Sequence, residues 1–156
     1  MSAAEAKFST HEEPIWRERA NFIINGALRE PDRFEQLWAR KVDENRFEIC
    51  CIPFFLYDLA LGDTVETAPR DSRQYVLSRV VNRSGRYVFR AFFERPQYRY
   101  RDSTVAALRG VGAQIEWSSP SLLAVDIEGS SAQKVADLLH GLEQQGQLVY
   151  ETGKST

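Results

Sequence analysis

The spacing of apolar residues changes near Gly85 and divides the chain into two kinds of structure. Before Gly85, short apolar runs are separated by turn residues, a pattern typical of closely spaced β-strands. After it, apolar stripes with helical spacing alternate with strand-like runs. We therefore expect an α+β fold with a flexible tail over residues 1–15, an antiparallel β-barrel-like half over 16–85 and a ferredoxin-like βαββαβ half over 86–153.

One stretch of the N-terminal half, residues 33–41, fits two structures. Phe34, Leu37 and Trp38 follow helical spacing, whereas the alternation of apolar and polar residues in the same stretch is that of a strand. The polar turn over 43–45 leads directly into another apolar run, which would complete a hairpin, and we favour a strand for this reason. The other strands predicted in this half cover about residues 19–28, 47–52, 64–68 and 74–81.

In the C-terminal half, two helical stripes lie among strand-like runs. The stripes occur at 105–111 and 135–142, and both show the spacing of an amphipathic helix. The strand-like runs lie at 87–93, 115–117, 122–127 and 148–152. This order predicts both helices on one face of an antiparallel sheet.

Composition adds little to this picture. The chain has 156 residues, 43% of them hydrophobic and 27% charged, with a formal net charge of -2, as in an ordinary globular protein. The longest apolar stretch, Ile49–Ala60, is interrupted by Pro53 and Asp58 and is too short to span a membrane. Residues 1–10 do not resemble a secretory signal, and we therefore expect a cytoplasmic location without membrane attachment.

Few residues offer catalytic chemistry, and we expect the protein not to be an enzyme. His11 lies in the expected tail and His140 on the polar side of its helix, so both are interpreted as surface residues. Cys50 and Cys51 are neighbours on an apolar strand, where a disulfide between them would be strained, and they are interpreted as buried, reduced thiols.

Neither a metal nor a cofactor is expected. No CxxC or HExxH pattern occurs, although a zinc site needs three or four suitable ligands. The glycine pair at 110 and 112 follows a helix instead of a strand and lacks a third glycine, so it is interpreted as a helix end and not as a phosphate-binding loop.

One basic segment suggests nucleic-acid binding. Residues 79–101 carry seven arginines and a single acid, Glu94, with aromatic residues between them. Guanidinium groups on phosphates and rings under bases would form a platform for single-stranded RNA, with Arg86, Tyr87, Phe89 and Arg90 as its candidates. In an RNA-recognition motif, however, the corresponding signature lies on the third strand and not on the first, so RNA binding is the alternative function.

Protein binding is the favoured function. The chain outside the basic segment is rich in carboxylates, and acidic surfaces attract basic nucleases by electrostatic steering. The connection over 53–63 is too apolar for an exposed loop, and a partner could dock there on Tyr57, Asp58 and Asp63. Equally, Phe54, Phe55 and Leu59 of this connection could simply cap the barrel. An unrecognised enzyme is the least favoured alternative.

Several segments resemble a bacterial family known only as a domain of unknown function. They are Phe47–Phe55, Leu61–Val65, Val80–Arg86 and Leu122–Ile127, and the resemblance extends over about residues 22–151. Some similar proteins look like immunity partners of toxins, including contact-dependent growth inhibition toxins, and the family offers no catalytic residues to transfer. The resemblance implies a cytoplasmic immunity protein that binds a toxin domain, with a nuclease as the expected toxin, and it does not indicate an oligomeric state.

Overall fold

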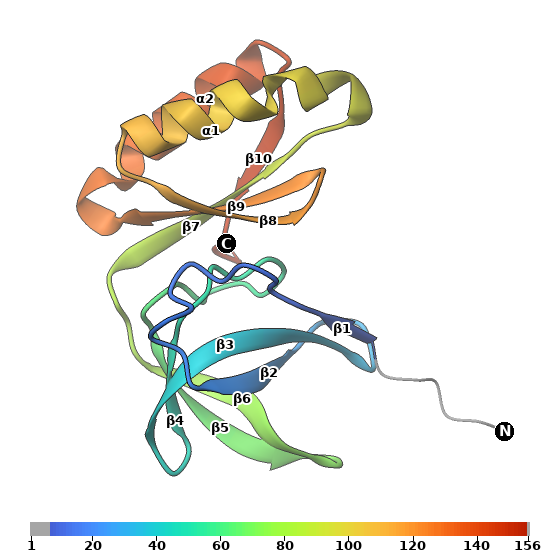
Figure 1. The fold of residues 1–156 in the computed structure, drawn as a ribbon, viewed down its shortest axis with the longest axis vertical. Coiled ribbons are helices and arrows are strands. Elements are labelled where there is room, and N and C mark those ends of the chain that lie inside the picture. Colours follow the sequence, from blue (N-terminus) through green and yellow to red (C-terminus); the bar gives the residue numbers. More distant parts are fainter. Residues whose placement is uncertain (1–6, 156) are drawn as a thin grey trace, which may run out of the picture.

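In the computed structural model of the chain, which describes residues 7–155, two layered halves lie one above the other (Figure 1). The lower half is a β-barrel and the upper half is a sheet covered by two helices, so the expected α+β fold is confirmed. The C-terminus returns to the junction between the halves (Figure 1).

The N-terminal half is a mixed barrel. Its strands are β1 Lys7–Ser9, β2 Phe22–Ala27, β3 Arg33–Asp43, β4 Arg46–Ile49, β5 Thr64–Arg70 and β6 Arg73–Asn82. The order is β1-β3-β2-β6-β5-β4, and a further pairing of β3 with β4 closes the last five into a barrel. Most pairs are antiparallel, but β2 joins β6 in parallel and β1 joins β3 in parallel.

Residues 33–41 are a strand, which confirms the favoured interpretation. β3 pairs with β4 across the turn that follows Asp43, as the hairpin prediction requires. Leu37 and Ala39 are fully buried on the same side of this strand and pack into the barrel core with Ile24, Phe47 and Ile49. Burial of alternate residues is what a strand with one face on a core produces.

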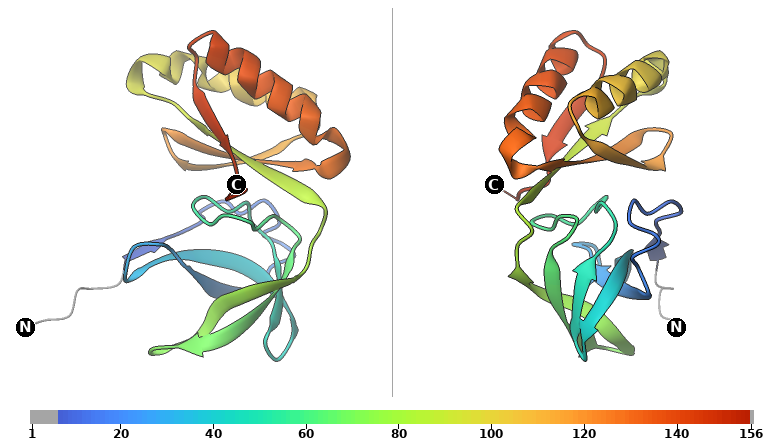
Figure 2. Two further views of the ribbon diagram at one scale, coloured as in Figure 1. Left: turned by 180° about the vertical axis from the view of Figure 1, so that it is seen from behind. Right: turned by 60° about the vertical axis from the view of Figure 1, so that its left-hand side comes forward.

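The C-terminal half has the predicted βαββαβ order. Its elements are β7 Arg86–Phe92, a 3₁₀ turn Arg95–Tyr100, α1 Arg101–Gly110, β8 Gln114–Ser119, β9 Leu122–Glu128, a 3₁₀ turn Gly129–Ser131, α2 Ala132–Gln144 and β10 Val149–Thr152. The sheet order is β10-β7-β9-β8, with every pair antiparallel. Both helices lie on the same face of this sheet (Figure 2).

The other face of the sheet packs on the barrel. Val88 of β7 and Ala124 of β9 form an apolar cluster with Ile52, Phe54 and Ala60 from the connection between β4 and β5. This apolar connection was expected to pack on something, and it does so between the two halves. The sheet face that an RNA-recognition motif offers to RNA is therefore covered here.

Residues 7–15 of the expected tail are part of the fold, so the prediction of a flexible tail is wrong for them. Residues 1–6 of that tail lie outside the described residues. Lys7–Ser9 form β1, and Pro14 is buried. His11 is only 2% exposed, and its assignment to the surface was wrong. The segment is polar and aperiodic, and a long-range charge contact holds it in place.

Candidate functional site

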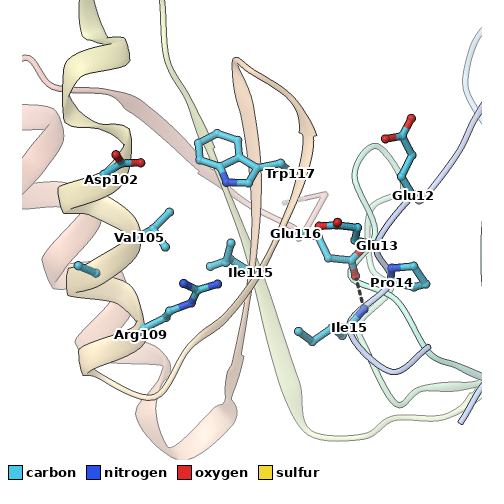
Figure 3. Close-up of a pocket in the computed structure, with 11 residues that line it drawn as sticks. Glu12, Glu13, Pro14, Ile15, Asp102, Val105, Arg109, Ile115, Glu116 and Trp117 are labelled. Atoms are coloured by element: carbon cyan, nitrogen blue, oxygen red, sulfur yellow. Dashed lines mark hydrogen bonds between the residues drawn. The ribbon is translucent and has the colours of Figure 1, made fainter. Parts of the chain in front are cut away.

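A groove runs beside β8, between the N-terminal segment and α1 (Figure 3). We call it the β8 groove, and its volume is about 830 Å³. Asp102, Val105, Ala106 and Arg109 of α1 form one wall, Glu12–Ile15 form the other, and Ile115–Trp117 of β8 lie between them. The groove thus depends on three segments from both halves of the protein.

Three carboxylates and one indole give the β8 groove its chemistry. Glu12, Glu13 and Asp102 are exposed, and among residues 7–155 none of them forms an ion pair. Trp117 is 37% exposed, while its ring packs 5.9 Å from that of Phe93. The groove therefore combines an anchored aromatic surface with an excess of negative charge.

Glu116 holds the N-terminal wall of the groove in place. One carboxylate oxygen accepts the backbone N–H groups of Ile15, at 3.3 Å, and of Ile52. The other accepts a hydrogen bond from Nδ1 of His11 at 2.8 Å. A single side chain of β8 thus fixes the N-terminal segment and the barrel connection against the sheet. Figure 3 shows its bond to Ile15.

His11 bridges two buried carboxylates. Its Nε2 donates to Glu35 of β3 at 2.7 Å, its Nδ1 donates to Glu116, and its ring stacks on Phe54 with centroids 3.9 Å apart. Burial opposes charge on the imidazole, but Cys51, Glu116 and Glu35 outweigh it and raise the pKa of His11 from 6.5 to about 12. A buried imidazolium that donates both protons is a structural cation, not a general base.

The raised pKa of His11 predicts a dependence of stability on pH. Because the folded pKa lies above the unfolded value of 6.5, the stabilisation is complete below about pH 6.5 and is lost as pH rises toward 12. We expect the free energy of unfolding to fall by up to about 1.4 kcal/mol per pH unit from this group. Urea titrations between about pH 7 and 8.5 should give this decrease in the free energy of unfolding for the wild type but not for His11→Gln. The same dependence on pH in both proteins would contradict the assignment.

Both cysteines are free and buried, as expected. Burial is the largest cause that raises the pKa of Cys50 to about 12, and burial likewise raises the pKa of Cys51. Thiols that stay protonated are poor nucleophiles. Cys51 packs in the barrel core, and the thiol of Cys50 donates to the carbonyl oxygen of Glu48 at 3.5 Å.

The residues predicted to bind a partner are distributed between surface and interior. Tyr57 is 45% exposed and donates its hydroxyl to Glu151, and Asp58 is a half-buried residue that accepts the N–H of Ser155. Asp63 is only 1% exposed and accepts the N–H groups of Ala60 and Ser84 at 2.9 and 2.8 Å. Asp63 therefore holds its own loop together and is not available to a partner.

Tyr57 borders a second hollow of about 1,090 Å³ on the opposite side of the junction. Phe8 and Phe55 are the other exposed aromatic residues in it. Its charges are mixed, since basic residues such as Arg29 and Lys154 lie near the acids Glu30 and Glu151. This hollow lacks the excess of acids found in the β8 groove, where Glu12, Glu13, Asp102 and Glu116 outnumber Arg109.

The four candidates for RNA binding do not form a platform. Arg90 is only 2% exposed, and its guanidinium donates to the carbonyl oxygens of Pro53 and Leu56. Phe89 is buried in the core below the helices, and Arg86 pairs with the buried carboxylate of Asp126 at 2.6 Å. Tyr87 is the most exposed of the four at 39%, and the ammonium of Lys154 lies over its ring, 5.1 Å from the centroid. The prediction of a shared Arg and aromatic surface was therefore wrong.

Sequence reasoning missed Glu12, Glu13, Asp102 and Trp117 as a site. The two glutamates lie in the segment that was expected to be a flexible tail, and Asp102 lies three residues before the helical stripe at 105–111. A signal was present at Trp117, because a large aromatic residue stands there in a short strand that is otherwise mostly polar. Such a strand is typical of a sheet edge, where one side chain can remain available for binding.

Comparisons with known proteins show the fold and a family. A hypothetical protein from Neisseria gonorrhoeae, known from a crystal structure, matches with a TM-score of 0.66 and 16% identity over 99% of this chain and 97% of that chain. A search of curated proteins found no match. The family described as "Domain of unknown function (DUF4265)" matches residues 35–150, which confirms the predicted resemblance to a family of that kind.

Two further properties concern residues 7–155. None of the helices there is long and apolar enough to cross a membrane. Within the same residues, no three side chains of His, Cys, Asp or Glu are grouped as a metal site would require.

Proposed function

The chain belongs to this family of domains of unknown function, and we propose that it is an immunity protein that binds a cognate toxin domain and blocks its active site. The toxin is a nuclease, the complex forms in the cytoplasm, and the protein acts by binding instead of catalysis. The observation that carries the proposal is the β8 groove, with three unpaired carboxylates around Trp117.

The charge of the groove supports a nuclease as the partner. Nucleases bind the phosphates of their substrates with lysine and arginine side chains, which leaves a basic surface around the active site. An inhibitor with Glu12 and Glu13 on one wall of its groove and Asp102 on the other can associate quickly with such a surface and compete with the nucleic acid. Trp117 supplies the aromatic anchor that interface hot spots favour.

The groove is also well prepared for binding. The wall at 12–15 is fixed through Glu116 and the buried His11, so little order has to be gained when the partner docks. Preorganisation of this kind lowers the entropic cost of association. A rigid acidic groove is therefore better suited to tight inhibition than a mobile acidic tail would be.

RNA binding receives less support than protein binding. The carboxylates of the β8 groove repel phosphates, while Arg86 and Arg90 are engaged with partners inside the protein. A salt-dependent titration with single-stranded RNA tests the alternative directly, since binding at low salt would favour it over the immunity function.

The proposed function is tested with Trp117→Ala. We expect the affinity for the toxin domain encoded beside this gene to fall at least about tenfold, because truncation of a central aromatic anchor costs roughly 2 kcal/mol or more. Isothermal titration calorimetry gives the affinity, and survival of cells that express the toxin gives the protection.

The matched control is Phe92→Ala, which truncates an exposed aromatic residue of β7 outside the β8 groove. It should bind like the wild type. Absence of any complex with the wild-type protein, together with no protection of the cells, would refute the immunity function.

A further inference from the structure

β8 is an outer strand of the four-stranded sheet and has a free edge. It pairs with β9 on one side, and within the described residues no strand pairs with the other side. The opposite outer strand, β10, is covered at its end, because the N–H of Asp58 donates to the carbonyl of Gly153. The free edge of β8 is thus the more open of the two.

The register identifies which backbone groups of β8 face outward. The N–H of Phe93 donates to the carbonyl of Ser121 at 2.8 Å, so the residues of β9 that bond to β7 are the odd-numbered ones. In an antiparallel ladder, successive residues direct their N–H and C=O groups to opposite sides. Ala124 and Asp126 therefore bond to β8, and their partners there are Glu116 and Gln114.

The N–H and C=O groups of Ile115 and Trp117 consequently point to the free edge, where no described backbone group bonds to them. Natural edge strands are normally protected by lysine, proline or a bulge. β8 has neither lysine nor proline between residues 114 and 118, and it pairs regularly with β9 from Gln114 to Trp117. The irregularity in this pairing lies between Trp117 and Ser119, at the end of the strand. The strand has the features of an edge that accepts a further strand.

The β8 groove lies along this same edge, because Ile115–Trp117 are the residues of β8 that line it. An extended segment paired with β8 would direct alternate side chains to opposite faces of the sheet. On one face they would meet Trp117 together with Asp102 and Arg109 of α1, and on the other they would meet Glu12 and Glu13 (Figure 3). The acids of the groove outnumber Arg109, so the groove as a whole still favours a basic segment. Lysine or arginine side chains complement the carboxylates on both faces, and apolar ones complement Trp117.

We propose that an extended, lysine- or arginine-rich segment of the partner protein adds to β8 as a fifth strand of the sheet. Backbone hydrogen bonds to Ile115 and Trp117 supply affinity, and the carboxylates of the groove select the basic sequence. This inference deepens the proposed function by naming the mode of binding, and it rests on that function for the identity of the partner.

The probe is the acetylated and amidated peptide Lys-Val-Lys-Val-Lys-Val-Lys, titrated into the full chain and followed by NMR. We expect saturable binding that slows hydrogen exchange at the amides of Ile115 and Trp117 at least about tenfold. The amide of Glu116, already bonded to β9, should change little. Binding without protection at Ile115 and Trp117, or no binding, would overturn the inference.

Two peptide controls separate backbone pairing from charge attraction. The same peptide with an N-methyl group on every residue has no backbone N–H to donate to the edge, and we expect at least about tenfold weaker binding. A peptide with glutamate in place of lysine should also bind at least about tenfold more weakly, because of Glu12, Glu13 and Asp102. Equal affinity of the N-methylated and the unmodified peptide would overturn strand addition.

The same exchange measurement on the toxin complex separates the two proposals. A tight complex in which the amides of Ile115 and Trp117 still exchange fast would overturn strand addition and leave the immunity function standing. If no toxin complex forms, the immunity function fails, while the peptide titration still decides whether the edge of β8 accepts a strand.

Discussion

His11→Ala should lower the free energy of unfolding by about 3–5 kcal/mol, because it leaves the buried carboxylates of Glu35 and Glu116 without the cation between them. The loss also removes one of the contacts that hold the N-terminal segment, which keeps the pairing of β1 with β3 and the bond from Ile15 to Glu116. In a chain of this length, such a loss corresponds to a decrease in the melting temperature of roughly 6–20 °C. Urea unfolding and calorimetry measure both quantities.

The other histidine supplies the control. His140 is exposed on α2, and His140→Ala should change the stability by no more than about 0.5 kcal/mol. The double variant His11→Ala/Glu116→Gln should be less destabilised than the sum of its single variants, because one buried charge is removed together with its partner. A His11→Ala protein within about 1 kcal/mol of the wild type would show that the buried ion triad is not a major source of stability.

Reversal of the groove charges should slow association with the toxin. In the variant Glu12→Lys/Glu13→Lys/Asp102→Lys, we expect the association rate constant at low salt to fall by about 10- to 100-fold, with a smaller change in dissociation. The protein itself should remain stable, since these carboxylates form no ion pair within the described residues. Stopped-flow measurements at low and high salt separate the two rate constants.

A matched variant separates local charge from total charge. Glu18→Lys/Glu44→Lys/Asp137→Lys reverses three exposed carboxylates outside the groove and gives the same net charge. Its association rate constant should stay much closer to that of the wild type than the rate constant of the groove variant does. Equal slowing by the two variants would indicate that the toxin responds to overall charge and not to the β8 groove.

The sequence predicts the order of elements well where one face of an element is buried. Leu139 and Val135 lie on the buried side of α2, and Ile127 and Val125 lie in the core as part of a continuous apolar strand. These local periodicities arise from burial against a single layer, so they can be recognised without knowledge of the partner element.

The functional surface could not be predicted in the same way, because its geometry depends on contacts between distant residues. His11 and Glu116 are 105 residues apart, and nothing near His11 in the sequence indicates that it is buried. Likewise, the guanidinium of Arg90 is satisfied by carbonyl oxygens from the connection between β4 and β5, so an arginine that resembles a nucleic-acid contact is an internal hydrogen-bond donor. Burial of a charge through long-range partners leaves no periodic pattern.

The role of Asp63 was only partly predictable from the local sequence. It follows Gly62 in a tight turn, and Asp residues commonly bond to the backbone of their own turns. That preference favours the structural role seen here, in which both carboxylate oxygens accept backbone N–H groups. The same acid was nevertheless predicted to contact a partner, because its apolar surroundings suggested an exposed docking loop.

The two walls of the β8 groove come from opposite ends of the architecture: residues 12–15 precede the barrel, whereas α1 belongs to the upper layer. Neither half alone would retain a complete binding surface. Exchange of one half between two related proteins would therefore produce chains whose groove has walls of different origin. In evolution, specificity for a new partner is then expected to arise from point substitutions along this seam, and recombination within the chain is expected to disrupt it.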